Sequence, residues 1–206
     1  MKVYFVRHAE SKLGAAGIHQ EDSTELSETG IKQAKILAKR FSRIPIDIIL
    51  CSSHKRAKQT AAIINQSFKK PIKFTSLLVE TRKPTEIQGK KVDDLEVVEI
   101  KELIKKHYHK GNWRHSDEET FDDLKERAEK AINLILNLKK ENILVVTHGM
   151  IMRTIIPMMI FGGLTPDMSV KINESFKTNN TGITLCEYTE EKKWVLRTWN
   201  DHAHLG

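Results

Sequence analysis

The sequence predicts an α/β fold with a mostly parallel central sheet, helices on both faces and antiparallel edge strands near the C-terminus. Short runs of β-branched and aromatic residues are typical of buried strands, and they alternate with stretches whose apolar residues have helical spacing. This β-α-β-α alternation predicts parallel strands joined by right-handed crossovers. No stretch between these elements resembles a linker, so we expect residues 1–206 to form a single domain.

Three of the predicted strands end in polar residues that a buried strand would not tolerate unpaired. In open α/β sheets, the carboxyl ends of the strands border the ligand crevice. The glycine after the last of these strands lets a backbone amide approach a ligand closely. The strands and the residues that follow them are Val3–Val6 before Arg7 and His8, Ile46–Leu50 before Ser52 and Ser53, and Ile143–Val146 before His148 and Gly149.

The helix predicted from about His54 to Phe68 carries Arg56 in its first turn. Ser52 or Ser53 is a candidate N-cap for this helix. Backbone amides, the positive end of a helix dipole and a guanidinium would then converge on one point, which favours a phosphate-sized anion. The sequence therefore predicts an anion site at this edge of the sheet.

The other helices are predicted from apolar periodicity and from their terminal residues. Ser27 is a candidate N-cap for the helix that follows it, and Ser116 with Glu119 forms a candidate capping box. These helices are expected from Ser27 to Phe41 with Ile31, Ala34, Leu37, Ala38 and Phe41 facing the sheet, from Asp93 to Lys106, from Asp117 to Lys140, and from Met150 to Phe161.

The remaining strands are short. Ile72–Phe74 is expected at one edge of the sheet, and Gly182–Tyr188 with Trp194–Thr198 is expected to extend the sheet as an antiparallel pair. Between the elements, Lys12–Glu25 and Arg82–Asp94 are predicted to be loops, and the first is expected to line the mouth of the crevice.

The net charge of +7 is compatible with an anionic partner. The lysines are spread along helices and no basic stretch is interleaved with aromatic residues, so no nucleic acid is expected. A basic surface also steers small anionic substrates. We therefore expect a small anionic ligand.

We expect neither a secretory signal nor a membrane span. Arg7 and His8 interrupt the N-terminal apolar run, and the apolar stretch Leu144–Leu164 is broken by polar residues, a proline and two glycines. Cys51 and Cys186 lie far apart without metal-ligand spacing, which is typical of reduced cysteines in a cytoplasmic protein. No pattern indicates an oligomeric state.

The motifs at the strand ends resemble those of the histidine phosphatase superfamily, also called phosphoglycerate mutase-like. Arg7-His8-Ala9-Glu10-Ser11 is similar to the family signature Arg-His-Gly-Glu-Ser/Thr, with Ala9 where glycine is usual. The resemblance spans nearly the whole chain. Further similar blocks are Leu26-Ser27 with Gly30 and Gln33-Ala34, Ser52-Ser53 through Arg56-Ala57 and Gln59-Thr60-Ala61, Thr147-His148-Gly149, Asn180-Thr181-Gly182, and Trp199 to His202.

The resemblance implies a phosphatase that needs no metal and no cofactor. His8 would accept the phosphoryl group, Arg7, Arg56 and His148 would bind its oxygens, and Glu80 would donate the proton. Glu10 and Glu86 are rival carboxylates in the same part of the sequence.

The residues that recognise the rest of the substrate are expected in the loops around the crevice. Gln20 in the loop Lys12–Glu25, Arg82 in the loop Arg82–Asp94, and Gly149 are the predicted substrate-binding residues. The segment His107–His115 is either a third recognition segment or a metal site, or, as its scattered basic residues favour, a solvated loop.

Two other functions remain open at this point. A phosphoglycerate-type mutase would return the phosphoryl group to another hydroxyl, although mutases usually carry more covering insertions than this chain offers. A non-catalytic module would hold a phosphorylated ligand without turnover, but the presence of both histidines disfavours it.

Overall fold

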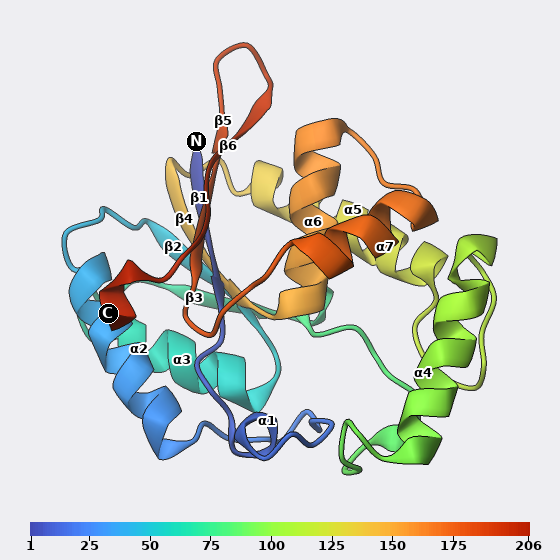
Figure 1. The fold of residues 1–206 in the computed structure, drawn as a ribbon. Helices are drawn as coiled ribbons and strands as arrows, with labels where there is room; N and C mark the ends of the chain where they lie inside the picture. The colour runs from blue at the N-terminus through green and yellow to red at the C-terminus, as the bar shows by residue number, and fades with distance from the viewer.

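The computed structural model describes residues 1–206. Six strands form one sheet in the order β3-β2-β4-β1-β5-β6 (Figure 1). The strands β3, β2, β4 and β1 are parallel to one another, β5 is antiparallel to β1, and β6 is antiparallel to β5, which confirms the predicted fold class. The strands are β1 (Lys2–Arg7), β2 (Ile48–Ser52), β3 (Ile72–Thr75), β4 (Asn142–Thr147), β5 (Ile183–Tyr188) and β6 (Trp194–Asp201).

Helices cover both faces of the sheet (Figure 1). Helices α2 (Glu28–Phe41) and α3 (Lys55–Asn65) lie on one face, and α5 (Phe121–Asn137) and α6 (Gly149–Phe161) lie on the other. Helix α7 (Pro166–Ser175) contacts α6. The short helix α1 (Lys12–Ala15) follows the carboxyl end of β1, and α4 (Leu95–His107) stands apart from the two layers.

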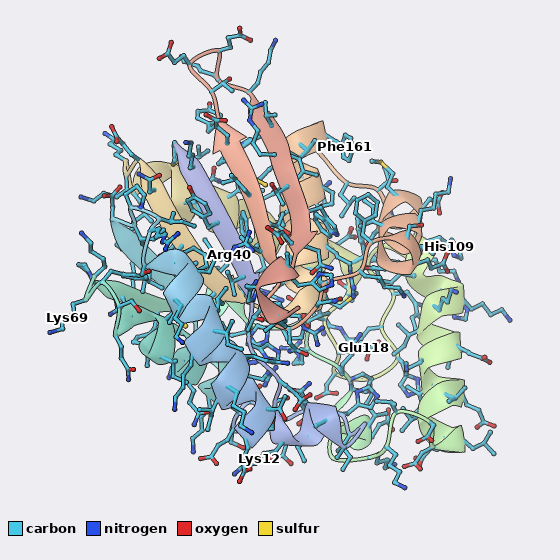
Figure 2. All side chains as sticks on the ribbon, turned by 60° about the vertical axis from the view of Figure 1, so that its left-hand side comes forward. Lys12, Arg40, Lys69, His109, Glu118 and Phe161 are labelled. Carbon is cyan, nitrogen blue, oxygen red and sulfur yellow. The ribbon has the colours of Figure 1, made fainter.

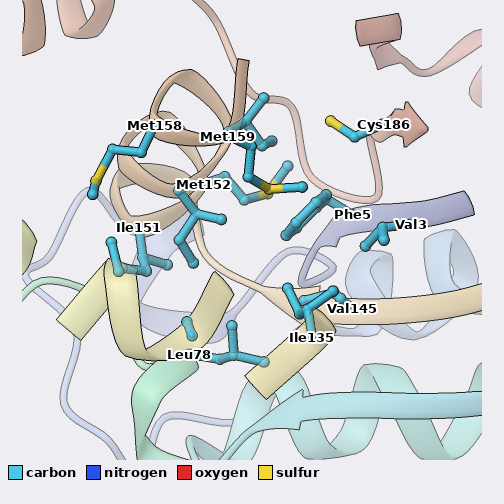
Figure 3. Packing of buried hydrophobic residues seen from close by; sticks show 14 of the residues in the cluster. Val3, Phe5, Leu78, Ile135, Val145, Ile151, Met152, Met158, Met159 and Cys186 are labelled. Carbon is cyan, nitrogen blue, oxygen red and sulfur yellow. The ribbon is translucent and has the colours of Figure 1, made fainter. Parts of the chain in front are cut away.

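Alternating residues of the central strands build two cores. In β4, Ile143 and Val145 belong to the core under α5 and α6, whereas Leu144 and Val146 belong to the core under α2 and α3. Because successive strand residues point to opposite faces, a parallel strand buried on both sides reads as an unbroken apolar run. Figure 3 shows the first core, in which Met152 and Phe5 lie together between α6 and β1.

The C-terminal strand β6 is linked to helix α2 by an ion pair. Arg40 on α2, labelled in Figure 2, forms an ion pair with Asp201 at the end of β6, and both side chains are partly buried. The strand therefore runs to Asp201, three residues beyond the predicted end at Thr198.

Two predicted helix caps are wrong. The N-cap of α3 is His54 rather than Ser52 or Ser53, because β2 continues through Ser52. The capping box of α5 is formed by Thr120 and Asp123 rather than by Ser116 and Glu119. Both carboxylate oxygens of Glu119 instead accept hydrogen bonds at 2.6 Å from Arg127, so Glu119 cannot cap the helix.

Other element boundaries also differ from the predictions. Helix α5 ends at Asn137, before Lys139 enters the left-handed region with φ of +50°. Ile31, predicted to face the sheet, is 39% exposed. Helix α7 was not predicted, although Thr165 before Pro166 is a typical helix start. The predicted loop Lys12–Glu25 contains α1. Helix α3 ends at Asn65 rather than at Phe68, and α4 begins at Leu95 rather than at Asp93.

None of the individual helices combines the length and the apolar composition of a membrane span. Helices α6 and α7 meet that criterion only as a pair, and the chain bends by 118° at the break between them.

Helix α2 packs unusually close to the segment that follows β1. A Cβ atom on Gly30 would lie 1.9 Å from the backbone oxygen of Glu10. We therefore expect Gly30→Ala to lower the free energy of unfolding by about 3 kcal/mol, the upper end for overpacking, because backbone must move. Urea unfolding measures this loss. Gly163→Ala is the control, since nothing lies within 4 Å of its added Cβ, and an equal effect of both changes would contradict the packing explanation.

Candidate active site

A cavity of about 710 Å³ lies at the carboxyl ends of the parallel strands. Arg7 and His8 enter it from the end of β1, and Arg56 enters from the first turn of α3. Glu80 enters from the segment after β3. His148 is fully buried and follows β4, with its ring centroid 4.9 Å from that of His8. The fold thus brings together five residues that are distant along the chain.

The ring of His8 is held in one tautomer by a backbone carbonyl. Its Nδ1 lies 2.7 Å from the oxygen of Ala9, which can only accept, so Nδ1 carries the proton. The opposite nitrogen, Nε2, is therefore unprotonated, and its lone pair accepts a hydrogen bond from Arg56 Nε at 3.3 Å. Ala9 has no positive φ and is completely buried, so the methyl group that replaces the usual glycine is accommodated.

Arg56 is fixed in place by three acceptors. Besides His8, its guanidinium donates to the backbone oxygen of Glu21 at 3.0 Å and to Nδ1 of His54 at 3.2 Å. Since a guanidinium only donates, His54 Nδ1 must accept, and the proton of the His54 ring is on Nε2, 2.9 Å from Asp22. The sequence prediction missed this histidine, although its position two residues before Arg56 at a helix start was a usable signal.

Arg7 and His148 each keep one buried nitrogen without a protein partner. Arg7 donates from Nη1 to the backbone oxygen of Thr178 at 2.6 Å, while its Nε is buried and unpaired. The Nε2 atom of His148 is hydrogen-bonded to Ser52 Oγ at 2.7 Å, while its Nδ1 is buried and unpaired. Buried polar atoms are rarely left unsatisfied, so these two atoms are candidates for contacts with a bound ligand.

Burial keeps the three histidines of the site neutral. Desolvation, followed by the charges of Arg56 and Arg7, holds the pKa of His8 well below its usual value of 6.5. Desolvation and the neighbouring His8 and Arg56 lower the pKa of His148 in the same direction. For His54, burial and the charge of Arg56 lower the pKa to about 4. A neutral imidazole retains the lone pair that a nucleophile needs.

These neutral histidines predict a loss of stability in mild acid. The unfolded chain takes up protons as the pH falls below about 6.5, whereas the folded His54 stays neutral until about pH 4. The free energy of unfolding should therefore fall over this window, and His54 alone contributes about 3 kcal/mol of the loss. Urea unfolding at several pH values measures the slope. His54→Asn should make the slope shallower, whereas the exposed His109→Ala should not, and an unchanged slope in His54→Asn would contradict the assignment.

Glu80 lies at the N-terminus of α6. Its carboxylate accepts from the backbone nitrogens of Met150 and Ile151 at 3.2 Å, and from that of Thr81 at 2.9 Å. The preceding segment is held by Arg127, which donates to the backbone oxygens of Leu77 at 3.0 Å and Val79 at 2.9 Å. This carboxylate is thereby fixed at the wall of the cavity.

The two rival carboxylates are placed differently. Glu10 also lines the cavity, but its Oε1 accepts from Ser27 Oγ at 2.6 Å at the start of α2. Glu86 does not line the cavity and is paired with His115 at 2.7 Å.

The predicted substrate-binding residues have different surroundings. Gln20 lines the cavity, and its Oε1 accepts from Ser11 Oγ at 2.6 Å. Arg82 lines it too but is exposed, and its Nε donates to the backbone oxygen of Asp117 at 2.7 Å. Gly149 begins α6 outside the cavity lining, where a Cβ would meet Thr178 Oγ1 at 3.0 Å.

Several cavity residues were not predicted from the sequence as parts of the site. Asn180 donates from Nδ2 to the backbone oxygen of His8 at 2.8 Å, which fixes the nucleophile segment. Lys83 and His19 line the same cavity and lie in loops that were predicted to recognise the substrate. No group of three or more His, Cys, Asp or Glu side chains is arranged to hold a metal ion.

A neutral imidazole beside guanidiniums, with a carboxylate across the cavity, is the set of groups used by enzymes that transfer a phosphoryl group through histidine. Residues 3–202 match the family model described as histidine phosphatase superfamily (branch 1). The chain belongs to this superfamily, which confirms the family predicted from the sequence motifs and makes the protein a hydrolase of the phosphatase class.

Relatives of this chain include phosphatases from several organisms. A probable phosphatase of Schizosaccharomyces pombe is 34% identical over 213 residues, covering 100% of this chain and 95% of the relative. A metal-independent phosphoserine phosphatase of Arabidopsis thaliana is 27% identical, covering 100% of this chain and 83% of the relative. The crystal structure of a mutant phosphoserine phosphatase from Entamoeba histolytica in complex with phosphoserine has a TM-score of 0.79 at 24% identity, covering 100% and 99% of the two chains.

Proposed function

We propose that this protein hydrolyses a small anionic phosphomonoester through a phosphohistidine on His8. The observation that carries the proposal is the ring of His8, whose Nδ1–H is held by the oxygen of Ala9 at 2.7 Å while Nε2 lies 3.3 Å from Arg56 Nε. The backbone contact fixes the tautomer, so Nε2 is the nucleophile. The guanidinium marks where the phosphoryl oxygens would lie.

In the first step, the lone pair of His8 Nε2 attacks phosphorus and a nitrogen–phosphorus bond forms. The bond to the leaving oxygen breaks, and Glu80 gives that oxygen its proton. Arg7 and Arg56 bind the equatorial oxygens, on which negative charge is spread in the transition state. The unpaired nitrogen of His148 would contact the same group, and a phosphate dianion would favour protonation of this ring.

In the second step, water attacks the phosphohistidine and the nitrogen–phosphorus bond breaks. The Glu80 carboxylate, which lost its proton in the first step, now takes one from the attacking water. Inorganic phosphate leaves and His8 returns to its neutral form.

The fixed cations explain how such a site would work without a metal ion. Arg7 and Arg56 are anchored by backbone oxygens of Thr178 and Glu21, so they need little reorganisation when charge develops. Phosphate monoesters require up to ~10²¹-fold acceleration. Fixed donors aimed at the oxygens on which charge develops account for a large share of such an effect.

The proposal also covers the extent of the catalytic domain and the cellular compartment of the protein. We propose that the catalytic domain is the whole chain 1–206, because cavity residues come from both its first and last quarters. A cytoplasmic location is supported by Cys51 and Cys186, which are buried, unpaired and far apart in sequence. The phosphoserine relatives support a small phosphorylated substrate.

Incubation with 3-phosphoglycerate tests the proposed reaction against its rivals. A phosphatase releases inorganic phosphate and glycerate, whereas a mutase yields the 2-phospho isomer and a binding module changes nothing. We expect phosphate release without isomer, monitored by phosphorus NMR. Accumulation of the 2-phospho isomer would show that the protein is a mutase and would overturn the proposal. A panel of sugar phosphates, nucleotides and phosphopeptides would then show whether turnover occurs with any phosphoester.

A further inference from the structure

Beyond the phosphoryl site, the cavity contains a lysine that pairs with nothing. Lys83 is half-buried and lines the cavity, yet its ammonium group has no hydrogen bond and no ion pair. Two other cations that line the cavity have protein partners: Arg127 binds Glu119 at 2.6 Å, and Arg82 donates to the backbone oxygen of Asp117 at 2.7 Å. A partly buried charge without a partner is costly, so it is typically retained to bind a ligand.

The backbone around Lys83 is fixed on both sides. Arg82 exchanges two hydrogen bonds with Glu119, through its backbone nitrogen at 3.3 Å and its backbone oxygen at 3.0 Å. Pro84 follows directly and is buried, with φ of −48°. The lysine therefore extends from a rigid segment three residues after Glu80, and both residues line the cavity. Such a position is preorganised for a ligand group next to the reacting phosphate.

A second unpaired group faces the same region. The Nε2 atom of His19 is buried without a partner, and His19 lines the cavity. Its backbone is held by Lys90, whose oxygen accepts at 2.9 Å, and by Gly89, whose nitrogen donates at 3.0 Å. His19 and Lys83 line the same cavity, and burial together with the charges of Lys101 and Lys83 lowers the pKa of His19, which favours its neutral form. A neutral imidazole with its proton on Nε2 can donate one hydrogen bond there.

We propose that Lys83 and His19 form a second anion subsite, and that the substrate carries a carboxylate in addition to its phosphoryl group. This proposal rests on the phosphatase activity proposed above. One ammonium and one neutral N–H match the single charge and the acceptor oxygens of a carboxylate. A second phosphoryl dianion would leave one charge unbalanced, and an uncharged sugar would leave the ammonium without a counter-charge. The cavity of about 710 Å³ has room for a ligand larger than phosphate.

The test compares substrates that differ by the carboxylate alone. Phosphoethanolamine is O-phospho-L-serine without its carboxylate, and glycerol 3-phosphate has a hydroxymethyl group where 3-phosphoglycerate has the carboxylate. We expect the wild-type kcat/KM to favour the carboxylate-bearing member of each pair by about 10- to 100-fold, the range for charge-assisted hydrogen bonds. A ratio near one in the wild type would overturn the proposal.

Variants assign the preference to the subsite. Lys83→Met should bring both ratios close to one by lowering kcat/KM for the carboxylate-bearing member of each pair more than for the other member. His19→Phe should lower the ratios by a smaller factor. Lys106→Met removes an equal charge from the exposed face of α4 and should leave both kcat/KM ratios at their wild-type values. If Lys83→Met slows both members of a pair equally, Lys83 acts on the chemistry through Glu80, and the carboxylate subsite is wrong.

A binding measurement separates this proposal from the proposed function. Titration calorimetry of phosphoserine and phosphoethanolamine into the protein needs no turnover if the measurement is made with His8→Ala. Tighter binding of phosphoserine that depends on Lys83 would support the subsite even if neither compound were hydrolysed by the wild type. Equal binding of the two compounds together with phosphate release from both would support the proposed phosphatase activity and contradict the carboxylate subsite.

Discussion

Replacing His8 by alanine should lower kcat for any phosphomonoester by at least about 10⁴-fold, the scale seen when a covalent nucleophile is removed. The methyl group cannot form the nitrogen–phosphorus bond, and the guanidiniums that remain only bind the substrate. Release of inorganic phosphate under saturating substrate measures this loss. The matched control is His109→Ala, because His109 is exposed and lies on the 3₁₀ turn after α4, away from the cavity.

The same variant tests the covalent intermediate directly. Wild-type protein mixed with a ³²P-labelled phosphoester and quenched in alkali within milliseconds should retain label that is stable in base and lost in acid. Label of this kind should be absent from His8→Ala and present in His109→Ala. Label that persists in His8→Ala would place the phosphoryl group on another residue, and His148 at a ring distance of 4.9 Å would be the first to examine.

The strand ends could be predicted because buried parallel strands have an unmistakable composition. A run such as Ile143–Val146 is apolar on both faces, so the polar residues that follow it must lie at the sheet edge. In a parallel sheet, all such ends lie on one side. That single rule places Arg7, His8 and His148 together without any knowledge of their contacts.

The roles of residues in loops could not be predicted in the same way. The position of His54 two residues before Arg56 marks it as a candidate, but its hydrogen bond to Arg56 depends on the rotamer of each side chain and on Asp22 from another loop. Lys83 looks like any surface lysine until the bonds of Arg82 to Glu119 show that its backbone is fixed. Tertiary pairing also explains why the cap of α5 was predicted wrongly. Arg127 lies eight residues beyond Glu119 and donates a hydrogen bond to its carboxylate.

Replacing Glu80 by glutamine should lower the rate of the first chemical step by about 10²- to 10⁴-fold for a substrate with an alkoxide leaving group, the usual contribution of a general acid. Glutamine keeps the size of the side chain and one oxygen for the nitrogens of Met150 and Ile151, but its amide cannot transfer a proton to the leaving oxygen. Because p-nitrophenolate leaves without protonation, the first turnover of p-nitrophenyl phosphate should slow by less than about 10-fold. Stopped-flow measurement of the burst separates these two cases.

The steady state of Glu80→Gln should then be limited by the second step. Without a carboxylate to take the proton of water, phosphohistidine should accumulate with p-nitrophenyl phosphate and be visible as acid-labile label. Glu86→Gln is the matched control, since Glu86 is paired with His115 outside the cavity and should leave both steps unchanged. Glu10→Gln tests the rival inside the cavity. If Glu10→Gln rather than Glu80→Gln slowed alkyl esters selectively, Glu10 would be the proton donor, and the position of Glu80 at the start of α6 would be structural.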